Sequence, residues 1–258
     1  LMFNFNALFL AILNGKKEIL KLVIANILGS VFALIVTSLL AIKYGLYGAL
    51  IDCKLAQQSG GVFMLRIEET DTKREVADAV KIIEESMHRF GLSYDNNPVY
   101  GPYYQSQRKD IYHSVVADLL ERGFAYPCFL SAEDMEQIRE NQKAAGFATG
   151  IYGEFARDRD LTENEIIERL DKGGVPTIRL YSMGNKDNKV FYNDKVRGRL
   201  AFPENEEDIV LIKSNDGLPT YHFAHLCDDH FMRTTHVIRG EEWLPSLPLH
   251  VQLFRMMG

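Results

Sequence analysis

Residues 62–90 read VFMLRIEETDTKREVADAVKIIEESMHRF, and this stretch decides the fold class. It opens with a short apolar run of the length of one β-strand, VFMLRI, which follows Gly60-Gly61 and ends in an acidic turn. Thr70, Asp71 and Thr72 then offer caps for the start of a helix. Apolar residues follow at the spacing of one helix face: Val76, Val80, Ile83, Met87 and Phe90. The order strand, turn, helix predicts an α/β fold.

The α/β alternation continues towards the carboxyl end. A helix is predicted over 106–121, and capping boxes at 131–134 and 162–165 predict the starts of two more. The β-like segments are 125–130, 175–183, 189–194, 198–202, 208–214 and 218–225. The last two flank Asn215-Asp216-Gly217, which predicts a hairpin turn between them.

Residues 1–45 differ in kind from the rest. The first 50 residues hold four lysines and one glutamate, so they carry +3, and the remainder of this chain of net charge −6 carries −9. Residues 22–42 contain no charged side chain, and a helix of this length can span a membrane. A buried core helix is the alternative. The block weakly resembles a helix pair of an oligosaccharide flippase, and residues 22–42 are a candidate membrane contact.

The overall composition bounds the class of protein. With 258 residues, 47% hydrophobic and 25% charged, the chain is neither a disordered tail nor a disulfide-stapled miniprotein. Three scattered cysteines favour a reducing compartment. At a pI of about 5.7 the whole molecule does not attract nucleic acid, so an RNA partner would need a local basic patch.

Two polar clusters could carry chemistry near an α/β sheet. The first follows the predicted strand, where ligands bind in open α/β sheets. Its carboxylates, Glu68, Glu69 and Asp71, could hold an ammonium group or a metal ion, or could be the acidic start of a helix. The second cluster, 222–230, reads HFAHLCDDH. Its spacing matches no closed tetrahedral metal site, which favours substrate contacts or buried polar groups over a metal.

A third cluster, 236–243, reads HVIRGEEW. Arg239 is placed to grip a carboxylate with two guanidinium nitrogens. A surface ion pair of Arg239 with Glu241 or Glu242 is the alternative. A substrate with both an ammonium and a carboxylate, such as an amino acid, would suit the first and third clusters together.

Four motifs together resemble a known family: LRIEETD (65–71), GPYYQSQR (101–108), LPTYHFAHLCDDHFM (218–232) and THVIRGEEWLPSLPLH (235–250). Residues 46–258 resemble the catalytic domain of bacterial glutamyl-tRNA synthetase, a class I aminoacyl-tRNA synthetase. The resemblance implies an incomplete Rossmann-like nucleotide-binding fold, with an inserted α+β subdomain at about 111–214 that contacts the acceptor end of tRNA(Glu). It also implies glutamate activation with ATP and Mg²⁺, and a cytoplasmic location for 46–258.

The resemblance further implies residue roles. Glu68 would accept the α-ammonium of glutamate, and Arg239 would pair with a substrate carboxylate. Tyr221 would hydrogen-bond the substrate with Glu242 nearby, and Trp243 would lie at the nucleotide.

His225 stands where many members of the family have Asn, and it could donate one hydrogen bond to glutamate. In the predicted insertion, Arg197 and Arg199 are candidates to meet RNA phosphates, with a solvated surface as the alternative. No residue is assigned to a metal.

The sequence departs from the family at its HIGH-type signature. LYGALID at 46–52 resembles the helix that follows this signature, but residues 42–45 are Ile-Lys-Tyr-Gly, without histidine. A KMSKS-type loop is also missing from the 258 residues. We therefore predict a glutamate–tRNA ligase fragment that has no assigned catalytic residue and does not form glutamyl-adenylate, with 1–45 a foreign or membrane segment. The alternative is a membrane-anchored, non-catalytic binding module built on a synthetase fold.

Overall fold

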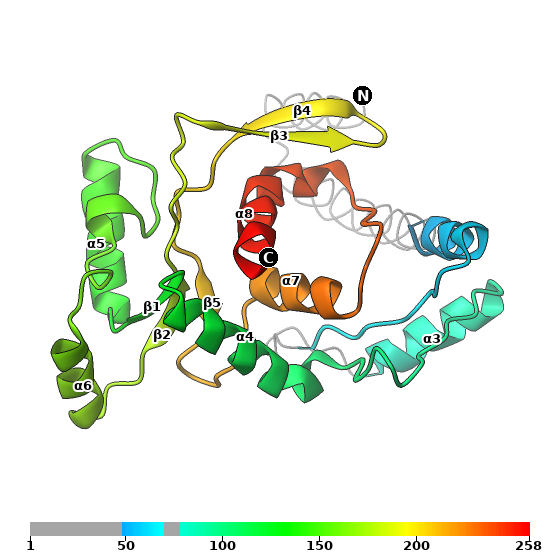
Figure 1. Cartoon of the computed structure of the whole chain (residues 1–258), viewed down its shortest axis with the longest axis horizontal. Helices are drawn as coiled ribbons and strands as arrows, with labels where there is room; N and C mark the ends of the chain where they lie inside the picture. Colours follow the sequence, from blue (N-terminus) through cyan, green and yellow to red (C-terminus); the bar gives the residue numbers. More distant parts are fainter. Residues whose placement is uncertain (1–47, 70–77) are drawn as a thin grey trace, which may run out of the picture. The chain divides into compact units, whose positions relative to one another are not determined.

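The computed structural model describes residues 48–69 and 78–258 (Figure 1). Residues 48–63 and 88–93 belong to one compact unit, and residues 64–69, 78–87 and 94–258 belong to a second. No helix within these described ranges is long and apolar enough to cross a membrane. The predictions for 1–45, which are an apolar helix, a membrane contact at 22–42 and the flippase resemblance, lie outside the described residues.

The helical elements after residue 78 agree with most of the predicted helices. They are α3 (Ala79–Arg89), η2 (Gln105–Arg108, a 3-10 turn), α4 (Lys109–Glu121), α5 (Ala132–Ala144), η3 (Gly153–Phe155), α6 (Glu163–Asp171), α7 (Tyr221–Phe231), η4 (Glu241–Ser246) and α8 (Leu247–Met257). Both predicted capping boxes are confirmed: Ser131 with Asp134 begins α5, and Thr162 with Glu165 begins α6.

The five described strands form two antiparallel sheets (Figure 1). They are β1 (Ala125–Cys128), β2 (Thr177–Leu180), β3 (Lys189–Asp194), β4 (Gly198–Pro203) and β5 (Val210–Ile212). The first sheet has the order β1-β2-β5, and β3 pairs with β4 as a hairpin. All five strands fall within the predicted insertion at about 111–214.

The apolar run at 62–67 is not a β-strand, so that prediction is wrong. Among the described residues, Ile67 alone of this run makes a bridge, parallel to Tyr104. The side chain of Asn96 satisfies the backbone of Leu65 as a neighbouring strand would, since it accepts from Leu65 N at 3.0 Å and donates to Leu65 O at 3.1 Å. A side chain thus replaces the strand neighbour that the prediction assumed.

The β-like segment 218–225 is helical from Tyr221 onward, which is a second correction. Only Pro219 pairs as in a strand, by an antiparallel bridge to Ile212 across the predicted turn. The buried apolar residues of α7 are Phe223, Ala224, Leu226 and Cys227. Their spacing fits one face of a helix, whereas a strand would point them to both faces.

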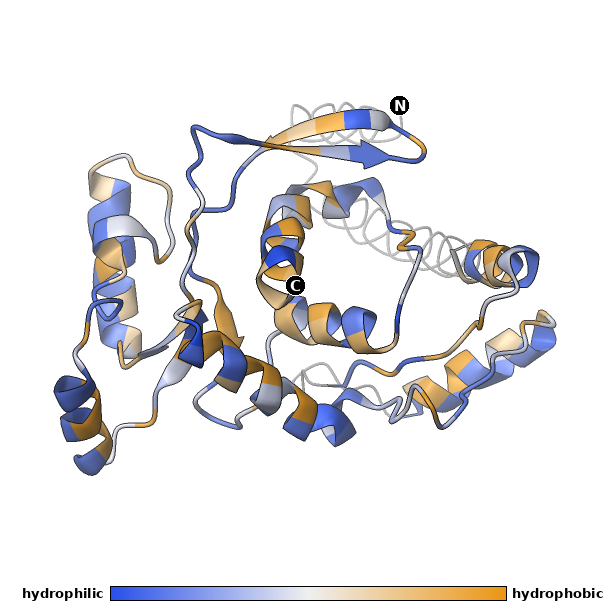
Figure 2. Ribbon diagram, viewed as in Figure 1, coloured by the Kyte–Doolittle hydropathy of each residue, from blue (hydrophilic) through white to orange (hydrophobic). Residues whose placement is uncertain are grey.

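One hydrophobic core joins α4, the three-stranded sheet, α7 and α8. Its buried members are Tyr112, Val115, Val116, Leu119, Ala125, Leu180, Leu211, Ile212, Phe223, Ala224, Leu226, Cys227, Leu249, Leu253 and Met256. Figure 2 shows hydrophobic and hydrophilic faces along the helices that contribute to it. The core fixes α7 and α8 against α4, so side chains on the opposite face of α7 are held on a rigid support.

Candidate functional site

Separate sequence motifs meet at the guanidinium of Arg66. Its Nη1 donates to Asp229 Oδ1 at 3.0 Å, and its Nη2 donates to Glu68 Oε1 at 2.9 Å. Nη2 also lies 2.9 Å from Nδ1 of His225. Burial lowers the pKa of Arg66, but the nearby carboxylates, Asp229 first among them, raise that pKa above its ordinary value. Arg66 is therefore a fixed cation that ties Glu68 to α7.

Asp228 is the centre of a second, fully buried cluster. Its Oδ1 accepts from Arg108 Nε at 2.6 Å, and its Oδ2 accepts from Gln105 Nε2 at 2.8 Å. The hydroxyl of Tyr112 donates to the same carboxylate at 3.0 Å, and Arg66 Nε lies 3.6 Å from it. Asp228 thus bears out the buried-polar-group interpretation of the second cluster, and it joins the GPYYQSQR motif to α7.

A stripe along α7 with a spacing of four residues carries Tyr221, His225 and Asp229, of which His225 and Asp229 are buried. The ring of Tyr221 stacks on that of His225, with centroids 5.9 Å apart and planes at 10°. His225 Nε2 lies 2.8 Å from Asp229 Oδ2. Burial raises the pKa of Asp229, but the contacts with His225 and Arg66 lower it below its ordinary value, so Asp229 is an anion.

Arg239 lies in a cage of aromatic rings. Its Cζ is 5.7 Å from the ring centroid of Tyr221 and 5.1 Å from that of Trp243. Its Nη2 lies against the ring edge of His225, 3.0 Å from Nδ1 and 2.5 Å from Nε2. Its Nη1 is buried and has no hydrogen-bond partner among the described residues. Because an unpaired buried donor costs free energy, this nitrogen favours an incoming acceptor such as a carboxylate.

The carboxylates Glu68 and Glu69 of the acidic cluster have different partners in the structure. Glu69 caps the start of η2, since its carboxylate accepts from Gln105 N at 3.2 Å and from Ser106 N at 3.0 Å. This agrees with the interpretation of the cluster as an acidic helix start, although the helix is η2 and not the helix predicted directly after residues 70–72. Glu68 keeps 34% of its side chain exposed and has Arg66 as its ion-pair partner. Glu68 is therefore the carboxylate that an incoming cation can reach, and Asp71 lies outside the described residues.

Arg239 does not pair with either neighbouring glutamate in the described structure. Glu241 pairs instead with Arg197, at the tip of the β3–β4 hairpin. The carboxylate of Glu242 folds back over Gly240, where an added Cβ would meet its oxygens at 2.2 Å. The surface-ion-pair alternative for Arg239 is therefore wrong, and its charge remains available to a ligand.

The histidines of the second cluster contact other side chains in the described structure. No group of three or more His, Cys, Asp or Glu side chains in 48–69 and 78–258 could hold a metal ion. His222 Nδ1 instead lies 3.0 Å from Nε2 of His250, on α8. Burial, followed by the positive surroundings, lowers the pKa of His250 to about 4, and burial also lowers the pKa of His222.

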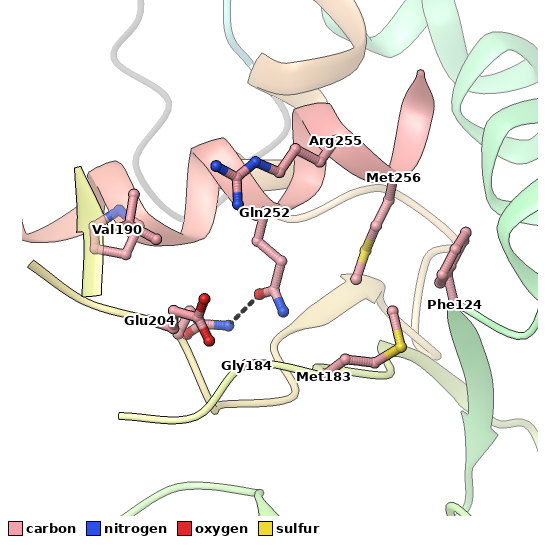
Figure 3. A pocket seen from close by; sticks show the side chains of 10 residues that line it. Phe124, Met183, Gly184, Val190, Glu204, Gln252, Arg255 and Met256 are labelled. Atoms are coloured by element: carbon pink, nitrogen blue, oxygen red, sulfur yellow. Dashed lines mark hydrogen bonds between the residues drawn. The ribbon is translucent and has the colours of Figure 1, made fainter. Parts of the chain in front are cut away.

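A cavity of about 220 Å³ lies elsewhere, beside α8 (Figure 3). Its lining residues are Phe124, Met183, Gly184, Val190, Glu204, Asn205, Pro248, Gln252, Arg255 and Met256. Asn205 Nδ2 donates to Gln252 Oε1 at 2.8 Å, and Gln252 Nε2 donates to Ser182 Oγ at 2.9 Å. These hydrogen bonds connect α8 to the two segments that flank the β3–β4 hairpin, one before β3 and one after β4. The cavity contains none of the sequence-predicted site residues.

The structure brings together Glu68, Tyr221, His225, Arg239 and Trp243, and leaves Glu242 beside them without a hydrogen bond of its own among the described residues. No individual role was predicted from the sequence for Arg66, Arg108, Asp228 or Asp229. The spacing of four from Tyr221 to Asp229 could have placed Asp229 on the same helix face, had α7 been predicted as a helix.

Comparison with known proteins gives a consistent result. The family described as tRNA synthetases class I (E and Q), catalytic domain, matches residues 45–258. The glutamate–tRNA ligase of Clostridium perfringens (strain 13 / Type A) is 51% identical over 222 residues, which are 83% of this chain and 40% of that protein. The glutamate–tRNA ligase of Acetivibrio thermocellus is 50% identical over 220 residues. The chain thus spans about two fifths of the length of the curated relatives it matches.

A solved structure agrees with the family match. The crystal structure of a glutamate tRNA ligase from Elizabethkingia meningosepticum CCUG26117, in complex with its amino acid, is 38% identical to this chain with a TM-score of 0.74. The match covers 83% of this chain and 44% of that one. These similarities span both the α7–α8 site and the strands.

Proposed function

Since the chain belongs to the class I tRNA synthetases (E and Q), we propose that it is the catalytic-domain part of a glutamate–tRNA ligase. In this reaction a carboxylate oxygen of glutamate attacks the α-phosphate of ATP and pyrophosphate leaves. The glutamyl group then passes to the terminal ribose of tRNA. We propose the cytoplasm as the location of this reaction. We propose that the α7 site of this chain binds the glutamate.

The observation that carries the proposal is the buried Nη1 of Arg239, which has no hydrogen-bond partner within 48–69 and 78–258. A carboxylate placed there would satisfy a buried donor and a full positive charge at once. Glu68, exposed on one side and fixed by Arg66 on the other, supports a site for the ammonium group. Arg66 and His225 connect these two side chains by short contacts, so an α-amino acid would meet its complementary charges on a rigid frame.

Tyr221 and Trp243 would form the walls of the site. Burial raises the pKa of Tyr221, so its hydroxyl remains a donor to the substrate at neutral pH. The indole of Trp243 is 37% exposed and packs on Tyr221, with centroids 5.2 Å apart, which suits a stacking contact with a nucleotide base. Glu242, free of other partners in the described residues, would lie at the edge of the substrate.

ATP supplies the phosphorus atom that glutamate attacks, and among the described residues we assign Trp243 alone to ATP, as a stacking contact for its base. We assign no protein ligand to Mg²⁺, which commonly binds through substrate phosphates with few protein carboxylates. The contribution of this chain is therefore to bind and orient the amino acid.

The β3–β4 hairpin is the proposed contact with the acceptor end of tRNA, as part of an insertion at about 111–214. From Lys189 to Pro203 it carries four basic side chains and one acidic one, against a chain of net charge −6. Arg199 stacks on the exposed ring of Phe191, with Cζ 4.6 Å from the centroid. Exposed aromatic rings and arginine planes are the usual platforms for unpaired RNA bases.

Isothermal titration of the chain with glutamate tests the proposal. We expect saturable binding that weakens at least about tenfold in Glu68→Gln and in Arg239→Ala, since each loses a charge-assisted hydrogen bond. Glu241→Gln is the matched control, because Glu241 pairs with Arg197 outside the site, and its affinity should equal that of the unaltered chain. Absence of binding to the unaltered chain, or equal affinity in all three variants, would contradict the proposal.

A further inference from the structure

The cavity beside α8 contains none of the residues of the α7 site and has an apolar and a polar end. Figure 3 shows Phe124, Met183 and Met256 gathered at one end, Glu204 at the other, and Gln252 between them. Its volume of about 220 Å³ is below the ~300–1,000 Å³ of pockets that enclose a drug-sized ligand. The cavity therefore suits one ring system, with the rest of the ligand outside it.

The apolar end offers surfaces against which a planar ring can pack. Met256 is 5% exposed and belongs to the hydrophobic core, whereas Met183 is 63% exposed in the same lining. The ring of Phe124 packs against that core, and the Cζ of Arg122 lies 4.9 Å from its centroid. Aromatic rings and polarizable thioethers both make favourable contacts with planar π systems. A ring bound here would cover Met183.

The polar end presents one acceptor and one donor. Glu204 Oε2 accepts from Asn185 N at 3.1 Å and from Asn188 Nδ2 at 3.2 Å, while its Oε1 has no hydrogen-bond partner within 48–69 and 78–258. Gln252 Nε2 donates to Ser182 Oγ at 2.9 Å. An amide nitrogen carries two N–H groups, and the second one of Gln252 has no partner among these same residues. A ring with a donor beside an acceptor on one edge would satisfy both groups.

Arg255 adds a cation to this lining. Its side chain is exposed and makes no hydrogen bond or ion pair with another described residue. It follows Gln252 by three residues on α8, a spacing that places both side chains on one face of the helix. A guanidinium binds phosphate oxygens through paired N–H donors. A ring that carries a phosphate group would thus meet apolar, hydrogen-bonding and charged partners in one place.

We propose that this cavity binds a single nucleotide whose base has an amino group beside an unprotonated ring nitrogen, as in cytosine and adenine. The base lies against Phe124 and the two methionines, and its phosphate pairs with Arg255. Its amino group donates to Glu204, and its ring nitrogen accepts from Gln252. Uracil is disfavoured, because it would place a carbonyl against Glu204 and a ring N–H against Gln252. The inference does not depend on the glutamate site.

NMR of the chain labelled with ¹³C at its methionine methyl groups tests the binding. Titration with cytidine monophosphate should shift the resonances of Met183 and Met256 in a saturable way. The resonance of Met135, on α5 and outside the lining, is the internal control and should not move. Uridine monophosphate should bind about tenfold more weakly or less, since both hydrogen bonds at the polar end are lost. The Met183→Ala variant assigns the Met183 resonance.

Two variants test the roles of the polar groups. Glu204→Gln keeps an oxygen for Asn185 and places an amide donor at the cavity, so the preference for cytidine over uridine monophosphate should disappear. Arg255→Gln should weaken both nucleotides at least about fivefold, because it removes the partner of the phosphate. Arg139→Gln is the matched control, since this exposed arginine of α5 pairs with Glu136 and should leave both affinities unchanged. Far-UV circular dichroism verifies that each variant is folded.

A free nucleotide and an unpaired residue of an RNA strand share the proposed chemistry. Shifts of Met183 and Met256 with cytidine monophosphate alone support a site for free nucleotides, whereas shifts only with the trinucleotide CpCpC support a site for an RNA strand. The proposal is overturned if neither probe shifts these two resonances. Equal affinity for the cytosine and uracil probes in the unaltered chain, or an unchanged preference in Glu204→Gln, also overturns it.

Discussion

The substitution Asp228→Asn tests the buried cluster that joins three motifs of the chain. The change is nearly isosteric, but it removes a negative charge that is 0% exposed. The Nε of Arg108, itself 1% exposed, lies 2.6 Å from that carboxylate. The asparagine also replaces one acceptor oxygen by a donor, which would face Gln105 Nε2 at the 2.8 Å contact. The variant thus leaves a buried guanidinium without its counter-ion and creates a clash of donors.

The expected cost is large relative to the stability of such a protein. Breaking a buried ion pair by removing one partner costs about 3–5 kcal/mol. Carbonyl groups near Arg108 compensate only in part, since Pro102 O accepts from its Nη1 at 3.0 Å. The total free energy of unfolding of a single domain is about 5–15 kcal/mol. We therefore expect Asp228→Asn to lose a third or more of the folding free energy.

Urea unfolding followed by far-UV circular dichroism measures the loss. Asp118→Asn is the matched control, because Asp118 pairs with Arg122 at 2.7 Å on the exposed face of α4. That exposed pair should be worth less than about 1 kcal/mol. A free energy of unfolding for Asp228→Asn within about 1 kcal/mol of that of the unaltered chain, with the same dependence on urea, would contradict this expectation.

Three further predictions concern pH, catalysis and RNA. Burial lowers the pKa of His250 to about 4, so the unfolded chain binds more protons than the native one between pH 6.5 and 4. The free energy of unfolding, measured by urea titration, should therefore fall by about 2–3 kcal/mol from pH 7 to pH 4.5. The variant His250→Phe should abolish most of that fall. Since Ile-Lys-Tyr-Gly occupies 42–45, the chain should show no glutamate-dependent exchange of pyrophosphate into ATP, and any such exchange above background would contradict this. Arg199→Ala should weaken tRNA binding and reduce the slope of log affinity against log salt by about one, whereas an unchanged slope would place the RNA elsewhere.

Local signals in the sequence predicted those elements whose stability is itself local. The capping boxes at 131–134 and 162–165 begin helices as expected, because a cap satisfies backbone N–H groups within one turn. The strands at 125–128 and 189–194 were also predicted, the second of them from the β-branched and aromatic residues Val190, Phe191 and Tyr192. For the capped helix starts no distant residue is needed to choose the structure, whereas the strand at 125–128 pairs with the distant strand at 177–180.

The two wrong strand predictions, at 62–67 and 218–225, concern segments whose structure depends on residues far away in the sequence. The run at 62–67 reads as a strand, but the side chain of Asn96 satisfies the backbone of Leu65 within it, and no local pattern reveals that partner. The segment 218–225 contains β-branched and aromatic residues, yet burial against α4 and α8 favours a helix from Tyr221 onward. Tertiary packing overrides propensity in both cases.

The adjacent carboxylates Asp228 and Asp229 show why the candidate site was only half predictable. On a helix, neighbouring side chains point about 100° apart, so one of the pair turns towards Arg108 and α4 while the other turns towards His225 and Arg66. As a strand, the segment would have pointed them to opposite faces with no reason to join either partner. Once 221–231 is read as a helix, the spacing of four carries Tyr221, His225 and Asp229 along one face, and the buried anion becomes the support of the ligand-facing side chains. The residues proposed to face the substrate can thus be named from motifs, whereas the side chains that support them follow only from the helix that the motifs form.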